Sequence, residues 1–357
     1  MASSYLLSLT EQKTMIITYF RSSSYNTHNM CEQQYFFDYV LGYRSPSNKK
    51  ADKGTIVHKA LEILAFIKYH QQQSNQSFED EIVGNVDVDD YDLDIIIKQV
   101  YDYYAGHFVH HKWTKTDYRD CYDWTYKAIN YNNGMFDPRN RNILYPEQQF
   151  DITINKDWAK YNYGDIKGNL AIKGTIDLIT KPNEDTLEII DWKTGKRLNW
   201  ATGEEKTQEK LEKDPQLMIY FYAAQKLYPK IKHCIVTIFF INDGGPFSMT
   251  FDRKDLFATE QLIKEKFNKI KSTIKPRLKK TWKCTKLCHY GKTTFEDTNI
   301  APIIEYRDNQ VCSVNTYMTK CEQVAHDISV KGYQNTVDEY TVPGYNVGHY
   351  KAPGSTE

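Results

Sequence analysis

Hydrophobic residues recur at helical spacing through the first third of the chain. Apolar residues three or four positions apart predict a helix from about Gly54 to Tyr69. The aromatic-rich segment Cys31–Tyr43 predicts a shorter helix that ends near Gly42, and Tyr101–Tyr131 predicts a helical region whose aromatic residues pack in a core. The acidic run Glu79–Asp94 is expected to form a surface loop.

After Pro146 the pattern changes to short apolar runs of the kind found in strands. Two helical segments follow within this region, one near Pro215–Leu227 and one near Leu256–Ile274. The tail after Ala325 has little periodicity, so a loosely packed end is expected. The predicted strands are Gln148–Ile154, Leu170–Thr180, Thr186–Trp192, Cys234–Asn242 and a strand that ends near Phe251. Together these elements predict an α/β fold, in which a mixed central β-sheet is flanked by helices and helical regions lie at both ends of the chain.

The size and composition are those of a soluble globular protein. A chain of 357 residues with 40% hydrophobic and 26% charged residues can form one large domain with insertions or two domains. The most apolar run, Cys234–Ile241, is far too short to span a bilayer, and Met1–Tyr19 lacks the pattern of a secretory signal. We therefore expect the protein to stay in the cytoplasm where it is made, without a membrane partner.

Charge is balanced overall but not along the chain. Lys and Arg total 46, and so do Asp and Glu, yet the stretch Lys266–Lys286 holds nine basic residues and no acidic one. Such a stretch is either a solvated helix face or a phosphate-binding surface, in which case Arg277, Lys279 and Lys280 are candidate nucleic-acid contacts. Seven cysteines in a chain of this length are typical of reduced thiols or metal ligands rather than disulfides.

The chemistry centres on Asp177, Asp191 and Lys193. Residues two apart on a strand share a face, so Asp191 and Lys193 point the same way. Two antiparallel strands joined near Asn183 would bring Asp177 beside Asp191. Two carboxylates with a lysine can hold Mg²⁺ or Mn²⁺ against a phosphate. The alternative is an ordinary surface ion pair, but each Asp directly follows β-branched residues, which indicates buried strands whose charged groups need partners.

These residues lie in motifs that resemble a known nuclease family. The segments Gly174-Thr-Ile-Asp177 and Ile190-Asp-Trp-Lys-Thr-Gly195 resemble the core of RecB-like and CRISPR-adaptation-like exonucleases of the PD-(D/E)XK superfamily. Further motifs of that family occur in the same order along the chain. They are Cys31-Glu-Gln-Gln-Tyr35, Tyr39-Val-Leu-Gly42, Gly54-Thr-Ile-Val-His58-Lys-Ala-Leu61 and the pair Gln216 and Tyr220. The resemblance covers about Cys31 to Cys288 and implies a restriction-endonuclease-like core.

The resemblance also implies roles for single residues. His58 would be a third metal ligand beside Asp177 and Asp191, and its imidazole suits Mn²⁺ better than Mg²⁺. Gln216 and Tyr220, one helical turn apart, would contact the phosphate of the scissile strand and Lys193. Lys193 would orient or deprotonate the attacking water or act as a fixed positive charge. Glu147 matches an acidic position of less certain role and is otherwise a solvent-exposed residue at a strand edge.

Related nucleases often carry a 4Fe-4S cluster held by one N-terminal and three C-terminal cysteines. Cys31, Cys284 and Cys288 stand at suggestive places, although three residues separate Cys284 from Cys288 where two are usual. Cys321 is the preferred fourth ligand, and Cys312 is a competitor. The alternative is that these are reduced structural thiols, as we expect for Cys121 and Cys234 in the core.

The implied activity is metal-dependent cleavage of DNA, from a free single-stranded end, in recombination, repair or genome processing. Helical segments on both sides of the core could roof the site, and a helicase or recombination protein could be a partner. A non-catalytic nucleic-acid-binding module and an RNA-cleaving nuclease remain alternatives. The bias toward Lys, Asn, Tyr and Ile suggests an AT-rich genome such as that of a phage, which would place the protein in the host cytoplasm. The expected regions are an N-terminal helical region with the His58 helix (1–145), a nuclease core (146–275) and a basic, cysteine-containing region that a cluster would close (276–357).

Overall fold

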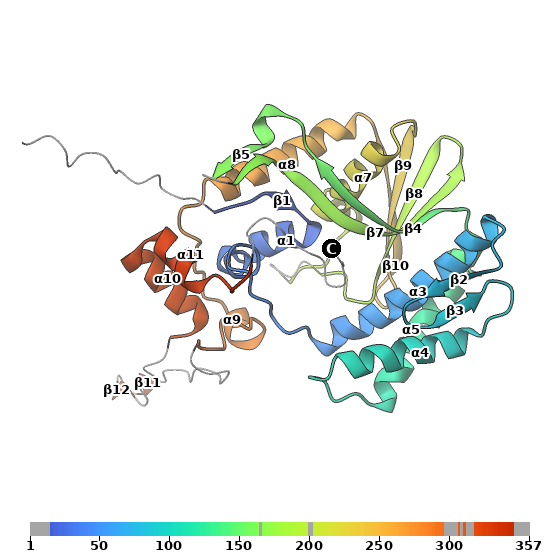
Figure 1. Cartoon of the computed structure of the whole chain (residues 1–357), viewed down its shortest axis with the longest axis horizontal. Coiled ribbons are helices and arrows are strands. Elements are labelled where there is room, and N and C mark those ends of the chain that lie inside the picture. The colour runs from blue at the N-terminus through green and yellow to red at the C-terminus, as the bar shows by residue number, and fades with distance from the viewer. Residues whose placement is uncertain are drawn as a thin grey trace, which may run out of the picture. The chain divides into compact units, whose positions relative to one another are not determined.

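The computed structural model describes residues 15–163, 166–198, 203–295, 306–307, 310–311 and 318–345 (Figure 1). Its contacts divide the chain into two compact units. The central unit consists of Ser47–Ile152 and Ile172–Gln261, and the terminal unit consists of Met1–Pro46, Thr153–Ala171 and Leu262–Glu357. Each unit is therefore built from separate stretches of sequence, which brings residues far apart in the chain into one core.

A mixed β-sheet forms the frame of the central unit. Its strands are β4 (Ile143–Thr153), β7 (Ala171–Asn183), β8 (Thr186–Lys193), β9 (His233–Phe240) and β10 (Gly245–Asp252). The order of the six-stranded sheet is β1-β7-β8-β9-β10, in which β1 is Tyr19–Phe20, and β4 also pairs with β7. The β7–β8 and β9–β10 pairs are antiparallel, whereas β8 and β9 run parallel. A parallel pair needs a crossover connection, and helix α7 (Pro215–Leu227) lies in that connection. The mixed sheet with flanking helices confirms the predicted α/β fold.

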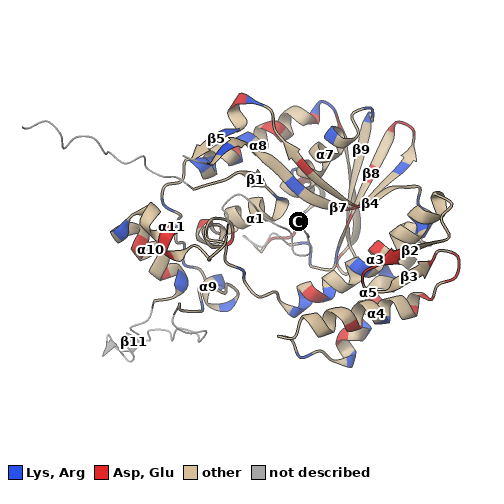
Figure 2. Ribbon diagram, in the orientation of Figure 1, with Lys and Arg blue, Asp and Glu red and all other residues tan. Residues whose placement is uncertain are grey.

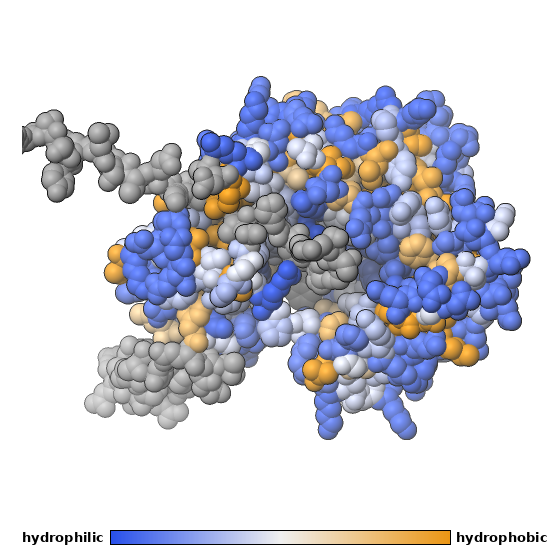
Figure 3. Space-filling model, in the orientation of Figure 1, coloured by the Kyte–Doolittle hydropathy of each residue, from blue (hydrophilic) through white to orange (hydrophobic). Residues whose placement is uncertain are grey.

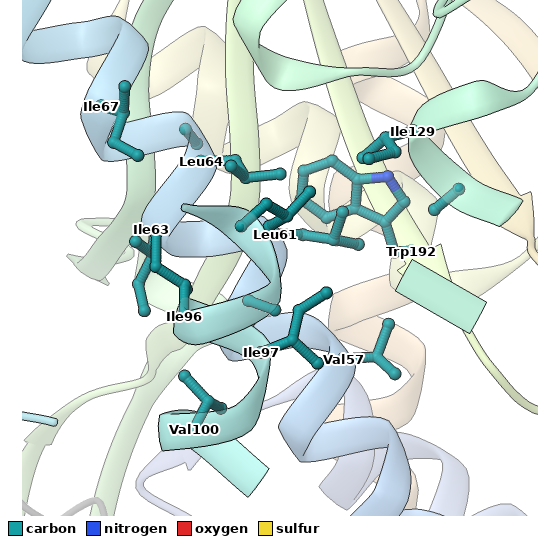
Figure 4. Close-up of a cluster of buried hydrophobic side chains, with 14 of the residues drawn as sticks. Val57, Leu61, Ile63, Leu64, Ile67, Ile96, Ile97, Val100, Ile129 and Trp192 are labelled. Atoms are coloured by element: carbon teal, nitrogen blue, oxygen red, sulfur yellow. The ribbon is translucent and has the colours of Figure 1, made fainter. Parts of the chain in front are cut away.

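Helix α3 (Lys49–Gln72) packs against α4 (Leu93–His107) and α5 (Lys115–Asn130) in the central unit (Figure 1). It begins five residues before the predicted start at Gly54, because the Asn48 side chain accepts a hydrogen bond from the backbone N–H of Ala51 at 3.0 Å and caps the helix. Apolar side chains of α3 and α4 surround Trp192 of β8 in one core (Figure 4). The helix that carries His58 is thus fixed against the strand that carries Asp191.

The sequence predicted a surface loop for the acidic run Glu79–Asp94, and this prediction is wrong. The run forms the hairpin β2 (Ser77–Asp80) and β3 (Gly84–Asp87) and then the start of α4 (Figure 2). Asp80 accepts the backbone N–H groups of Ile82 and Val83, and Asp92 caps α4. These carboxylates hold turns and a helix end, so their clustering is explained by local hydrogen bonding.

The terminal unit collects helices from both ends of the chain. Its N-terminal elements are β1 (Tyr19–Phe20), α1 (Ser22–Met30), α2 (Glu32–Tyr35) and the π-helical turn η1 (Phe36–Val40). The central stretch contributes η3 (Asp157–Ala159), β5 (Lys160–Tyr163) and β6 (Ile166–Asn169), and the C-terminal stretch contributes α9 (Trp282–Lys286), β11 (Tyr306–Arg307), β12 (Gln310–Val311), α10 (Lys320–Lys331) and α11 (Tyr333–Tyr340). Helix α8 (Asp255–Lys271) begins in the central unit and ends in the terminal one, while η2 (Pro138–Asn140) and α6 (Gln208–Leu211) belong to the central unit.

The described part of the tail after Ala325, which ends at Tyr345, is more ordered than predicted. Thr319 and Glu322 form a capping box at the start of α10, and Ile328, Tyr333 and Val337 of α10 and α11 are buried. Two short helices joined at Gly332 interrupt the apolar periodicity, which is why the pattern was weak in sequence.

Hydrophilic residues cover most of the surface in view, with apolar residues scattered among them (Figure 3). No helix in the described part of the chain is both long and apolar enough to cross a membrane.

Candidate active site

Asp177 and Asp191 come together because β7 and β8 form an antiparallel hairpin. Leu178 pairs with Ile190, so the neighbouring residues Asp177 and Asp191 follow in the same register. Oδ2 of Asp177 accepts a hydrogen bond from the backbone N–H of Trp192 at 3.0 Å. The strand that supplies Asp191 therefore also holds the side chain of Asp177.

Lys193 and Asp191 lie on one face of β8, and Nζ of Lys193 is 2.6 Å from Oδ2 of Asp191. The Asp191 side chain is fully buried, whereas 32% of the Lys193 side chain is exposed. Burial raises the pKa of Asp191, which Lys193 only partly offsets. Burial by itself would lower the pKa of Lys193, but Asp191 and Asp177 outweigh it and raise that pKa. Lys193 is thus held as a cation that reaches solvent.

Helix α7 contributes Gln216 and Tyr220. Nε2 of Gln216 lies 3.0 Å from Oδ1 of Asp191 and 3.0 Å from the hydroxyl of Tyr220. The two residues share a helix face, as their spacing of four predicts. Asp214 caps the helix by accepting the backbone N–H of Gln216, and this fixes the first turn beside the strand.

Helix α3 brings His58 to the same carboxylates. Nδ1 of His58 lies 3.3 Å from Oδ2 of Asp177. One helical turn earlier, Gly54 faces Thr194, and a Cβ at Gly54 would lie 2.7 Å from the Thr194 hydroxyl. The glycine therefore permits the close approach of α3 to the end of β8 that sets the position of His58.

Glu147 stands on β4 in a left-handed backbone conformation, with φ of 48°. This conformation is costly for a residue other than glycine and commonly marks a functional position. Burial raises the pKa of Glu147 to about 9, and the nearby carboxylates of Asp177 and Glu62 add to the shift. Glu147 is thus electrostatically linked to the candidate site and is not a fully exposed residue at the edge of the sheet.

The donor set fits a divalent cation. Burial, with repulsion from neighbouring carboxylates, raises the pKa values of Asp191 and Glu147: Asp177 acts on both, and Glu62 also acts on Glu147. Burial raises the pKa of Glu62 as well, with contributions from Asp80 and Glu81. Oδ2 of Asp191 makes no well-directed hydrogen bond despite the nearby Lys193. The ligand atoms of His58, Asp177 and Asp191 do not all lie within 4.8 Å of one another. Among the described residues, only Asp52, His110 and His111 bring three ligand atoms that close together. The carboxylates instead turn toward Trp192 N–H, Gln216 and Lys193.

The candidate cluster ligands Cys31, Cys284, Cys288 and Cys321 all lie in the terminal unit. The thiols of Cys288 and Cys321 hydrogen-bond to each other, which lowers the pKa of Cys288 and raises that of Cys321, and the charges of Cys31 and Cys284 also act on Cys321. The six cysteines of the described segments are free thiols, and Cys121 and Cys234 are fully buried, as predicted. Cys312 lies outside the described residues.

Arg277, Lys279 and Lys280 are exposed residues of the same terminal unit. Arg277 and Lys280 line a groove of about 1060 Å³ together with Lys269, Lys275, Glu32 and Glu322. Lys280 pairs with Glu322, and the backbone N–H of Arg277 donates to Glu32. The groove is thus mainly basic, but two glutamates neutralise part of its charge.

A protein-family model described as the PD-(D/E)XK nuclease superfamily matches residues 22–292, about three quarters of the chain. The chain belongs to the PD-(D/E)XK nuclease superfamily. Members of this superfamily are phosphodiester-cleaving nucleases that use divalent metals, so the family indicates a metal-dependent nuclease. No curated protein matched the sequence.

Sequence reasoning missed Glu62, although a signal for it was present. Glu62 is four residues after His58 on α3, so both lie on one helix face. It is largely buried, it contacts Lys59 at 2.8 Å, and its charge raises the pKa of Glu147. Glu62 is therefore linked to the candidate site of this PD-(D/E)XK nuclease through its effect on Glu147.

Proposed function

We propose that this PD-(D/E)XK nuclease cleaves DNA and degrades single strands from a free end, in recombination, repair or genome processing. The observation that carries the proposal is the convergence of Asp177, Asp191 and Lys193 from one hairpin with Gln216 from α7 and His58 from α3. A degenerate, merely DNA-binding relative would have no need to keep all of these groups in contact.

In this proposal a bound Mg²⁺ or Mn²⁺ would supply a water of lowered pKa and would screen the phosphate charge. Asp177, Asp191 and His58 would hold the ion, and the imidazole favours Mn²⁺. Glu147 would supply a further carboxylate. Lys193, kept protonated by two carboxylates, would act as a fixed positive charge at the phosphate. Gln216 would orient Asp191 through its hydrogen bond, and Tyr220 would in turn orient Gln216.

The basic groove of the terminal unit supports a nucleic-acid substrate. Arg277, Lys269 and Lys275 line the groove, and Lys279 is an exposed residue two positions after Arg277. Phosphate contacts of this kind release counterions, so binding should weaken steeply as the salt concentration rises. Because Lys280 is already paired with Glu322, we expect Arg277→Ala and Lys279→Ala to weaken binding more than Lys280→Ala does. Lys167→Ala, an exposed lysine on β6, is the matched control.

A 4Fe-4S cluster in the terminal unit is part of the same proposal. Cys31, Cys284, Cys288 and Cys321 influence one another electrostatically, and backbone N–H groups of Gln34 and Thr281 lie 3.4 Å from the sulfurs of Cys31 and Cys284. Such N–H groups stabilise thiolate ligands of iron–sulfur clusters.

Cleavage assays test the proposed function directly. A labelled linear single strand, the same strand circularised, a blunt duplex and a linear RNA are incubated with Mn²⁺, Mg²⁺ or a chelator. We expect metal-dependent loss of the linear DNA strand only. Rapid loss of the circular strand would mean an endonuclease, loss of the RNA would support the alternative substrate, and binding without any cleavage would identify a non-catalytic module.

A further inference from the structure

A second group of metal-ligating side chains lies at the start of α3, apart from the carboxylates around Asp191. Oδ2 of Asp52 is 2.7 Å from Nε2 of His111 and 3.8 Å from Nε2 of His110. All three ligand atoms lie within 4.8 Å of one another. Asp52 is in the first turn of α3, whereas the two histidines lie in the connection between α4 and α5. The group therefore joins segments almost 60 residues apart within the central unit.

The spacing of the three atoms suits a first-row transition metal. Ligand bonds of 2.0–2.1 Å in tetrahedral geometry separate the ligand atoms by about 3.3 Å. The two observed contacts of Asp52 lie on either side of this value, so shifts of about half an ångström would bring the atoms into place. Two imidazoles and a carboxylate are donors that Zn²⁺ and Co²⁺ accept readily, whereas Mg²⁺ prefers oxygen ligands.

The charge of Asp52 also calls for a cation. Its side chain is only 4% exposed, and within the described residues it pairs with the two histidines and not with lysine or arginine. A buried carboxylate is stable only when it is paired or coordinated. Ser47 adds a fourth polar atom, with its Oγ 2.7 Å from Oδ2 of Asp52 and 3.5 Å from Nε2 of His110.

We propose that Asp52, His110 and His111 form a structural Zn²⁺ site that ties the start of α3 to the α4–α5 connection. Ser47 would hydrogen-bond to Asp52 and orient it, as outer-shell partners of metal ligands do, and water would complete the coordination. The 42% exposed His110 side chain gives the ion a path from solvent. This inference does not rest on the proposed nuclease function, although the helix that it anchors carries His58.

Equilibrium dialysis of the full chain against Zn²⁺ tests the site. His110→Ala is the first variant, because this side chain is exposed and its loss should leave the fold intact. His107→Ala, at the exposed C-terminal end of α4, is the matched control. We expect the wild type and His107→Ala to bind one zinc more than His110→Ala, or to bind it at least tenfold more tightly. Zn²⁺ should also raise the melting temperature of the wild type more than that of His110→Ala.

Two further measurements distinguish zinc bound at the proposed site from zinc bound elsewhere on the protein. An Asp177→Asn/Asp191→Asn double variant should keep the extra zinc, because the proposed site does not use those residues. With Co²⁺, the proposed site should show visible absorption of a nitrogen- and oxygen-ligated ion without the sulfur charge-transfer bands that cysteine ligands produce. Equal zinc binding by the wild type, His110→Ala and His111→Ala would overturn the proposal and leave a hydrogen-bonded contact between Asp52 and His111.

Discussion

Both side-chain oxygens of Asp191 face other candidate residues, Gln216 and Lys193, and its strand neighbour Trp192 holds Asp177. We predict that Asp177→Asn, Asp191→Asn and Lys193→Ala each reduce metal-dependent cleavage by roughly 10²-fold or more and leave DNA binding nearly unchanged. Single-turnover cleavage and a binding assay measure the two effects separately. Asp185→Asn, in the exposed β7–β8 turn, is the control, and near wild-type turnover in any of the three variants would refute these assignments.

Lys266 provides a test of stability against pH. It is 4% exposed, and its Nζ lies 2.8 Å from Nδ1 of His28 and 2.6 Å from Oδ1 of Asn29. Burial, with a contribution from Lys269, lowers the pKa of Lys266 to about 7, although Glu32 opposes the shift. Between pH 7 and the usual lysine pKa of about 10.4 the unfolded chain binds more protons than the folded one, so the free energy of unfolding rises with pH in that window.

We therefore predict that Lys266→Met is more stable than the wild type at pH 7 and that the difference narrows by about 2–3 kcal/mol at pH 9.5. Urea denaturation of both proteins at the two pH values measures it. Taking the difference in free energy of unfolding between the two proteins removes the contribution of every group that titrates alike in both. A difference that stays constant with pH would mean that Lys266 is not neutral in the folded protein.

At the scale of single residues, the sequence predicted which residues belong to the candidate site better than it predicted the contacts between them. Asp177, Asp191 and Lys193 were predicted because strand periodicity and the hairpin bring them together, and the register bears out that juxtaposition. The contact of Gln216 with Asp191 depends on where α7 packs, which periodicity does not determine. The left-handed backbone at Glu147 likewise gives no sequence signal, since the residue is not a glycine.

At the scale of elements, Gly174 sets how closely β7 approaches β4. A Cβ at Gly174 would lie 2.6 Å from the ring of Phe150, and that ring in turn stacks edge-on against Tyr220 at 6.4 Å between centroids. We predict that Gly174→Ala destabilises the protein by about 1–3 kcal/mol and lowers cleavage, because the displaced ring disturbs Tyr220 and Gln216. Adding Phe150→Leu should restore most of both losses.

Thermal melting and cleavage rates of the single and double variants measure this coupling. Gly106→Ala is the control, because that glycine is in helix α4 with open space around its Cβ, so alanine should be neutral or slightly stabilising. Additive effects of Gly174→Ala and Phe150→Leu would show that the two residues do not act through the contact described here.

Long periodic elements were predicted well and short ones poorly. Helix α7 begins and ends at the predicted residues, because an aspartate cap and a proline mark its start. The β2–β3 hairpin was missed because its strands are four residues long and its charged residues suggested solvent. A helical region was expected at the C-terminal end of the chain, but the bounds of α10 and α11 were not predicted, because a glycine divides the two helices and each has few apolar positions.

At the scale of the whole molecule, each unit has a core of its own, so the two should respond differently to loss of the proposed cluster. We predict that Cys31→Ser and Cys284→Ser lose iron and colour after anaerobic purification and lower one calorimetric transition by roughly 5 °C or more. A second transition, that of the central unit, should stay in place. Cys234→Ala, in a buried strand outside the cluster, should keep its iron.

Iron and sulfide analysis accompanies the calorimetry. Colourless, iron-free and fully active wild-type protein would refute the cluster while leaving the assignments around Asp191 untouched. The spacing of the cysteines in the sequence could not identify the fourth cluster ligand, because Cys321 lies 33 residues after Cys288.

The division of the terminal unit among three stretches of sequence also bears on synthesis. The central unit ends at Gln261, so all of it has been translated while the C-terminal partners of the N-terminal segment are still missing. Cys31 precedes Cys321 by 290 residues, which takes about 15–60 s at bacterial elongation rates of roughly 5–20 residues per second. During that interval the apolar residues of α2 and η1 and the Cys31 thiol lack the C-terminal residues that they contact in the folded protein. The nascent chain can therefore aggregate, and its thiol can be oxidised, before it leaves the ribosome.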